Sequence, residues 1–148
     1  GVHDLSFPEE CFDMYAAQNR VFETTKFRFG YSSLISPNST YDYDMVTRER
    51  TLLKQTEVPK YDPLLYKCER TFCTAKDGTN VPISIVYRKD SNWGKAKKAS
   101  PCMLYGYGSY GICIDPSFDY KCVSYLDRGM VFAIAHIRGG GGGGRRGE

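Results

Sequence analysis

Residues 27–55 read FRFGYSSLISPNSTYDYDMVTRERTLLKQ, and this stretch decides the fold of the first half of the chain. Aromatic and polar residues alternate along 27–31 and again along 41–45, and a third segment of strand-like character covers 50–55. Alternation with a period of two is typical of strands that bury one face. Turn-forming residues such as Ser36–Ser39 separate the segments. The pattern therefore predicts a small antiparallel meander with one aromatic and one charged face.

The meander is followed by a segment of different character. It contains Pro59 and Pro63 and shows no periodicity, which is typical of a linker. We therefore expect a boundary between Pro59 and Tyr66, and divide the chain into two domains, residues 1–62 and 63–148.

A second strand pattern begins after the linker. A short strand is expected over 70–75, and Asp77-Gly78 favours the backbone conformations of a tight hairpin turn. Apolar residues then alternate over 81–87 and predict the return strand. Residues 102–105 form a short apolar segment. Residues 130–137 are apolar apart from His136, which is typical of a strand buried on both faces of a parallel sheet. The second half therefore predicts the start of an α/β sheet.

Composition excludes several classes of protein. The chain has 148 residues with a net charge of +3, which is too weak to indicate a nucleic-acid partner. The longest apolar run, Met130–Ala135, is far shorter than the roughly 20 residues of a membrane helix, so no membrane partner is expected. Six cysteines without a C-x-x-C pair argue against a zinc site and a disulfide framework, and favour a reducing, cytoplasmic location. No metal or cofactor is expected.

Two glycine-rich segments allow other interpretations. Gly106–Gly111 reads GYGSYG and fits the G-x-G-x-x-G fingerprint of dinucleotide sites. The fingerprint requires a helix directly afterwards, and residues 112–118 show no helical period, so nucleotide binding stays an alternative only. A second segment begins at Arg138, continues through the run Gly139–Gly144, and ends with Arg145, Arg146 and Gly147. It matches a single copy of an Arg-Gly nucleic-acid segment. Its position after a buried strand favours a loop at the carboxyl end of a sheet.

A serine nucleophile with its base cannot be assembled from this chain. Ser109 has Tyr107 where the G-x-S-x-G motif requires glycine, and no other serine fits the motif. His136 lies in the most apolar segment, where a hydrogen-bonded core histidine is favoured over a general base.

Several segments in a fixed order together resemble the prolyl oligopeptidase family of serine peptidases, and its oligopeptidase B branch in particular. They are Tyr41–Met45, Leu52–Gln55, Asp77–Thr79, Val81–Ser84, Leu104–Gly111, Asp115-Pro116, Leu126–Gly129 and Ala135–Gly141. The resemblance runs from about Phe27 to Arg146. It implies a mixed fold, in which the end of a β-propeller is followed by the N-terminal part of an α/β-hydrolase sheet.

The same resemblance implies roles for two tyrosines. Tyr107 matches the tyrosine whose hydroxyl forms half of the oxyanion hole, and Tyr110 matches a position near the pocket for the residue before the scissile bond. For each, the alternative is a packing role, at a strand end for Tyr107 and over the core for Tyr110. The implied substrates are short peptides, with basic residues favoured before the cut.

The resemblance also places the catalytic serine, aspartate and histidine of the family downstream of the equivalent of Glu148. We therefore expect a fragment with cut ends that is inactive alone and pairs with the missing C-terminal part of its domain. Gly142 stands where the family has glutamate, and the aromatic pair expected after Arg146 is replaced by Gly147-Glu148. The alternative is a non-catalytic interaction protein or a decayed homologue.

Overall fold

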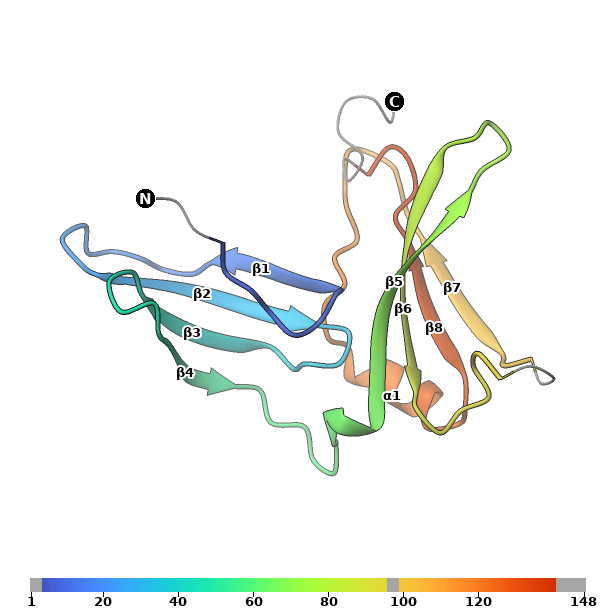
Figure 1. Cartoon of the computed structure of the whole chain (residues 1–148), viewed down its shortest axis with the longest axis horizontal. Helices are drawn as coiled ribbons and strands as arrows, with labels where there is room; N and C mark the ends of the chain where they lie inside the picture. Colours follow the sequence, from blue (N-terminus) through green and yellow to red (C-terminus); the bar gives the residue numbers. More distant parts are fainter. Residues whose placement is uncertain (1–3, 96–98, 141–148) are drawn as a thin grey trace.

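The computed structural model describes residues 4–95 and 99–140, which form two four-stranded sheets (Figure 1). The first sheet has the order β1-β2-β3-β4, and the second has the order β5-β6-β8-β7. The strands of the first sheet are β1 (Phe12–Ala16), β2 (Lys26–Ser33), β3 (Ser39–Asp44) and β4 (Arg50–Gln55). Those of the second are β5 (Tyr66–Thr74), β6 (Asn80–Arg88), β7 (Cys102–Gly106) and β8 (Val131–Ala135). A short 3-10 turn, η1 (Pro63–Leu65), precedes β5, and the helix α1 (Tyr120–Leu126) precedes β8.

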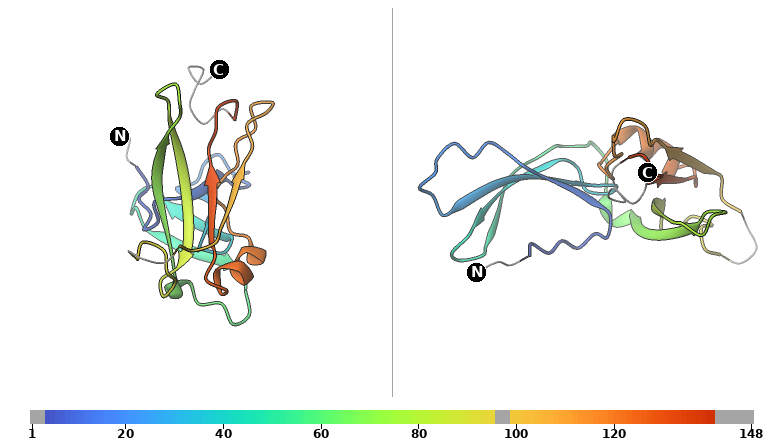
Figure 2. Two further views of the ribbon diagram at one scale, coloured as in Figure 1. Left: turned by 90° about the vertical axis from the view of Figure 1, so that its right-hand side faces the viewer. Right: turned by 90° about the horizontal axis from the view of Figure 1, so that it is seen from above.

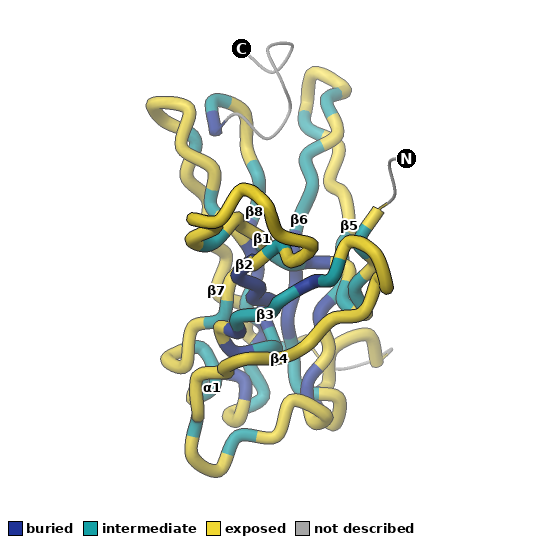
Figure 3. Tube along the Cα trace, turned by 90° about the vertical axis from the view of Figure 1, so that its left-hand side faces the viewer, coloured by how far each residue is buried: buried dark blue, intermediate teal, exposed yellow. Residues whose placement is uncertain are grey.

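The first sheet confirms the predicted meander. All its strand pairs are antiparallel, and Phe29 of β2 lies opposite Tyr41 of β3 on the aromatic face. Phe29 is fully buried there, and Phe7 from the N-terminal segment stacks on Tyr31 with ring centroids 4.4 Å apart. Figure 3 shows burial concentrated along β2, whereas β4 is exposed along its whole length.

β1 was not predicted, because its sequence carries no clear alternation. Its residues are half-buried or exposed, so no apolar face marks it. It pairs with β2 in a register that sets Tyr15 opposite Gly30. The Tyr15 ring occupies the space that a side chain at position 30 would fill. The strand therefore depends on a contact that only the folded chain reveals.

The second sheet begins with the predicted hairpin. β5 and β6 pair from Tyr66↔Arg88 to Thr74↔Asn80, and the turn between them holds Gly78 at φ 85°. The strand starts at Tyr66 rather than at Arg70, and near its start Tyr66 and Cys68 are buried while Lys67 between them is exposed. β8 pairs antiparallel with β6 and parallel with β7, and the chain crosses from β7 to β8 through α1. Parallel neighbours require such a crossover.

The two sheets meet in a shared core. Cys11 and Leu34, which flank strands of the first sheet, pack in one cluster with buried residues of the second. The other members of this cluster are Tyr66, Cys68, Val86, Leu126 and Ile134. Hydrogen bonds reinforce the junction, among them Phe118 N to Ser32 Oγ at 2.9 Å. Figure 2 shows that the two sheets extend from this junction on opposite sides.

None of the helices among the described residues is long and apolar enough to cross a membrane.

Candidate functional site

The candidate site lies at the carboxyl ends of β7 and β8. Because these strands are parallel, the loops that follow them leave the second sheet at the same end. The turn of the β5–β6 hairpin lies at this end too, uppermost in Figure 1. Three segments distant in sequence, residues 75–79, 107–111 and 136–140, therefore surround one end of the sheet.

Glycines let the loops after β7 and β8 pack backbone against backbone. A Cβ at Gly108 would overlap the carbonyl oxygen of Arg138, and a Cβ at Gly139 would overlap the carbonyl oxygen of Gly108. Gly139 also has φ 86°, a conformation that other residues rarely adopt. The amide of Gly111 donates to the carbonyl of Gly139 at 3.0 Å. The two loops are thus interlocked through main-chain atoms.

Tyr107 directly follows β7, at the start of the interlocked loop. Its side chain is 36% exposed, and its hydroxyl has no hydrogen-bond partner among the residues that the structure describes. A free phenol O–H at a strand end is a donor available to a ligand. The oxyanion role assigned by resemblance stays a prediction.

Tyr110 lies at the tip of the same loop. Its side chain is 93% exposed, so the ring covers no core formed by the described residues, and its role at a substrate pocket stays a prediction. Its backbone has φ 58°, and the next residue, Gly111, has φ 68°. Ile112 N donates to Ser109 O at 3.1 Å and closes the turn. A non-glycine residue in this region costs energy, and such residues gather at functional sites.

His136 is hydrogen-bonded, as predicted, but it is only partly buried. Its Nε2 lies 2.7 Å from the Oγ of Ser84, a fully buried residue of β6. Burial lowers the pKa of His136, and the charge of Arg70 lowers it further. Ser84 shows no relative exposure and cannot meet a substrate, so this pair is structural. Sequence reasoning missed Ser84, because a serine within an apolar strand carries no signal of its partner.

An ion pair joins two of the three segments. Arg138 Nη1 lies 2.5 Å from Asp77 Oδ2, which belongs to the β5–β6 turn. The amide of Thr79 donates to Asp77 Oδ1 at 3.1 Å. This amide, and then Arg138, hold the pKa of Asp77 below its ordinary value. The sequence marked Asp77 only as a turn residue and Arg138 only as the start of a glycine loop.

Other parts of the glycine loop lie outside the described residues. These are Gly141 to Gly144, with Arg145 and Arg146, and they include the position of Gly142 where the family has glutamate. The first glycine segment, Gly106–Gly111, is described, and residues 112–118 after it form no helix. The helix that a dinucleotide fingerprint needs does not follow it directly.

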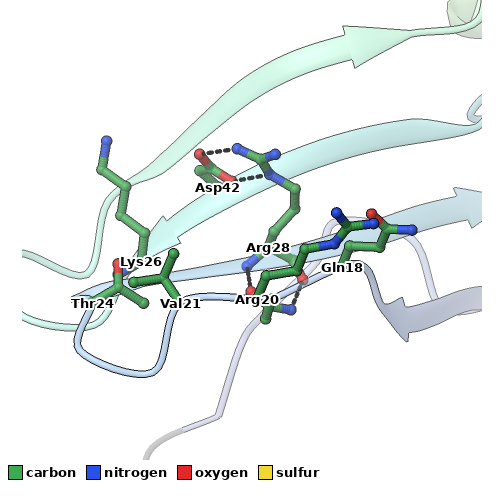
Figure 4. Close-up of a pocket in the computed structure, with 8 residues that line it drawn as sticks. Gln18, Arg20, Val21, Thr24, Lys26, Arg28 and Asp42 are labelled. Atoms are coloured by element: carbon green, nitrogen blue, oxygen red, sulfur yellow. Dashed lines mark hydrogen bonds and ion pairs between the residues drawn. The ribbon is translucent and has the colours of Figure 1, made fainter.

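Of the hollows lined by described residues, one lies near these elements and another lies far from them. One, of about 370 Å³, lies between β7 and α1 and is mainly apolar, with Leu104, Tyr125 and Phe132 among its lining residues. The other, also about 370 Å³, lies beside the β1–β2 loop of the first sheet (Figure 4). There Arg28 makes a double contact with Asp42, at 2.7 and 2.9 Å, so its charge is already paired. Within residues 4–95 and 99–140, no group of histidines, cysteines and carboxylates is arranged to hold a metal.

The comparisons with known proteins bear directly on the first sheet. Residues 3–56 match the family described as the N-terminal beta-propeller domain of prolyl oligopeptidase. Propeller blades are four-stranded antiparallel sheets, as β1–β4 is. The first half of the chain is therefore a propeller segment.

Relatives extend the likeness over most of the chain. Dipeptidyl aminopeptidase BI of Pseudoxanthomonas mexicana is 45% identical over 134 residues, which cover 89% of this chain and 18% of that protein. Oligopeptidase B from Leishmania major has a TM-score of 0.80 at 44% identity, and the match covers 91% of this chain and 19% of that one. Oligopeptidase B from Trypanosoma brucei, solved in a closed form with covalently bound antipain, has a TM-score of 0.82 at 44% identity, covering 93% and 19%.

The chain belongs to the prolyl oligopeptidase family, whose members are serine peptidases. It spans about a fifth of the length of the relatives that it matches.

Proposed function

We propose that this chain acts as part of a serine oligopeptidase, in which Tyr107 donates a hydrogen bond to the oxyanion formed during peptide hydrolysis. Attack on a peptide carbonyl places negative charge on its oxygen, and a donor fixed beforehand stabilises that charge. The observation that carries the proposal is the place of Tyr107 at the carboxyl end of β7, in a loop held by main-chain contacts, where its hydroxyl has no hydrogen-bond partner within residues 4–95 and 99–140. The family relationship supports the reaction class.

The second sheet is proposed to be the opening part of an α/β-hydrolase domain, with the domain boundary between residues 62 and 63. The strand order β5-β6-β8-β7 supports this, since two antiparallel strands come first and a parallel pair follows. The linker before β5 supports the boundary, because residues 56–65 contain no strand and include η1.

The proposed substrates are short peptides, with a basic residue favoured before the cut and the ring of Tyr110 lining the pocket for that residue. The likeness to oligopeptidase B supports this substrate class. The exposure of the Tyr110 ring is compatible with contact to a substrate. A cytoplasmic location is part of the proposal, and the six free thiols favour a reducing compartment.

The nucleophile must come from elsewhere, because no serine in the chain fits the required motif. We propose that the C-terminal part of the hydrolase domain supplies it and pairs with β7. Among the described residues β7 hydrogen-bonds only to β8, and Cys102–Gly106 is exposed along its length. An unpaired strand edge is a template for another strand.

The experiment has two arms. Residues 1–148 alone are expected to give no turnover of an Arg- or Lys-containing fluorogenic peptide, and turnover blocked by a serine-directed inhibitor would overturn the fragment proposal. In the intact peptidase, Tyr107→Phe should lower kcat by about 100-fold with little change in KM, as for loss of one oxyanion donor. Tyr120→Phe, at an exposed position of α1, removes a hydroxyl far from this loop and serves as the control. An unchanged kcat for Tyr107→Phe would exclude the oxyanion role.

A further inference from the structure

The ion pair of Asp77 and Arg138 is placed where the β5–β6 turn meets the loop after β8. Its atoms are 2.5 Å apart, and the residues are 61 positions apart in sequence. Asp77 is already fixed on its other oxygen by the amide of Thr79. The carboxylate is therefore presented to Arg138 in a fixed orientation by the turn itself.

Arg138 is coupled to Tyr107 through the backbone. The carbonyl oxygen of Arg138 lies against Gly108, at a spot where a Cβ would overlap it. Gly108 is the residue directly after Tyr107, and its own carbonyl lies against Gly139. A shift of Arg138 therefore displaces the residues that hold the backbone of Tyr107.

This ion pair is poorly suited to a stabilising role. The side chains of Arg138 and Asp77 are 53% and 47% exposed, and exposed pairs contribute little to the free energy of unfolding. The geometry instead favours a role in position, because small displacements of a catalytic group have large effects on rate.

We propose that the Asp77–Arg138 ion pair is a positioning device that holds the loop of Tyr107, so that its hydroxyl keeps the place needed for the oxyanion. This inference rests on the proposed function and deepens it by naming two further residues. Neither residue needs to touch the substrate, so their effect should appear in kcat rather than in KM.

The test is a mutant cycle in the intact peptidase. Asp77→Asn removes the charge but keeps an oxygen for the amide of Thr79, and Arg138→Gln keeps much of the side-chain stem. Each single variant should lower kcat about tenfold with KM unchanged. The double variant should be no worse than either single one, because both break the same contact. Arg138→Lys should recover part of the rate.

The matched control is Arg28→Gln, which breaks an ion pair of 2.7 Å with an arginine that is 47% exposed, in the first sheet. It should leave kcat unchanged. The melting temperature of every variant should lie close to that of the parent, and this agreement would show that the variants fold. A rise in KM for Arg138→Gln, additive losses in the double variant, or an unchanged kcat would overturn the inference.

A second background separates this inference from the proposed function. When Tyr107 is already phenylalanine, Arg138→Gln should cause no further loss of kcat, because it acts through the missing hydroxyl. If Tyr107→Phe lowers kcat and Arg138→Gln lowers it again by the same factor, only the positioning role fails. If Tyr107→Phe has no effect by itself, the oxyanion proposal fails first.

Discussion

Ser84 Oγ and His136 Nε2 are 2.7 Å apart, and this hydrogen bond ties β6 to the residue that follows β8. The amide of His136 also donates to the carbonyl of Pro82 at 2.9 Å, so the two segments are joined by side chain and backbone. The strand pairing of β6 and β8 is thereby extended towards the loop that contains Arg138. This contact continues the sheet up to the candidate site.

His136 should make the free energy of unfolding depend on pH below neutrality. Burial first, and then the positive charge of Arg70, lower its pKa, although Asp115 and a hydrogen bond to the Ile114 backbone oppose this. In the unfolded chain the imidazole titrates near 6.5, so below about pH 6.5 the unfolded state binds more protons. The free energy of unfolding should therefore fall as the pH drops below about 6.5, and level off below the folded-state pKa.

The measurement is thermal unfolding at pH 7.5 and pH 5.5, for the parent protein and for His136→Gln. The variant cannot take up the proton, so its melting temperature should fall less between the two pH values. An equal fall in both proteins would assign the pH dependence to other groups.

Gly139 should tolerate alanine much less well than Gly78. Both have positive φ, 86° and 85°, so alanine is strained at each by about 1–2 kcal/mol. A Cβ at Gly78 meets nothing within 4 Å, whereas one at Gly139 overlaps the carbonyl of Gly108. Gly139→Ala should therefore cost about 3 kcal/mol or more of unfolding free energy, and Gly78→Ala about 1 kcal/mol. Chemical denaturation measures both, and equal losses would show that the loops are not interlocked as described.

Val86 tests whether the two sheets unfold together. It is 1% exposed and lies in the core cluster that also contains Leu34 and Cys11 from the first half of the chain. Val86→Ala removes two methyl groups and leaves a cavity, which should cost about 2–3 kcal/mol. Because the core is shared, the unfolding transition should move to the same lower midpoint whether it is followed by the fluorescence of Trp93, in the second half, or by the circular dichroism of both sheets. A shift in fluorescence alone would indicate independent unfolding.

Local patterns predicted most of the strands, but not the contacts between distant residues. Period-two alternation predicted β2 and β3, and Asp77-Gly78 predicted the hairpin turn, because both signals lie within a few residues. β1 was missed, since its side chains are mostly exposed and its place depends on Tyr15 covering Gly30. Long-range pairs such as Asp77 with Arg138 follow from the topology, which the local sequence does not encode. The roles of Tyr107 and Tyr110 came from family resemblance, because no spacing rule marks a lone tyrosine as an oxyanion donor.

Tyr61 should contribute to the junction between the sheets through its hydroxyl as well as its ring. The hydroxyl donates to the carbonyl of Ile35 at 2.7 Å, and the ring stacks on Tyr66 with centroids 5.1 Å apart. Burial raises the pKa of Tyr61, so the hydroxyl remains a donor throughout the neutral and mildly alkaline range. Tyr61→Phe leaves the Ile35 carbonyl without this donor and should lower the free energy of unfolding by about 1 kcal/mol.

Tyr61→Leu also removes the stacked ring and should lower the free energy of unfolding by about 1 kcal/mol more than Tyr61→Phe. Tyr120→Phe, at an exposed site, should change it by less than about 0.5 kcal/mol. Urea denaturation of the three variants gives the comparison. If Tyr61→Phe is as stable as the parent, the hydroxyl does not hold the linker against the end of β2, and the ring alone accounts for the contact. If Tyr61→Leu is no worse than Tyr61→Phe, the junction depends on the hydrogen bond instead, because the stacking on Tyr66 would then contribute nothing measurable.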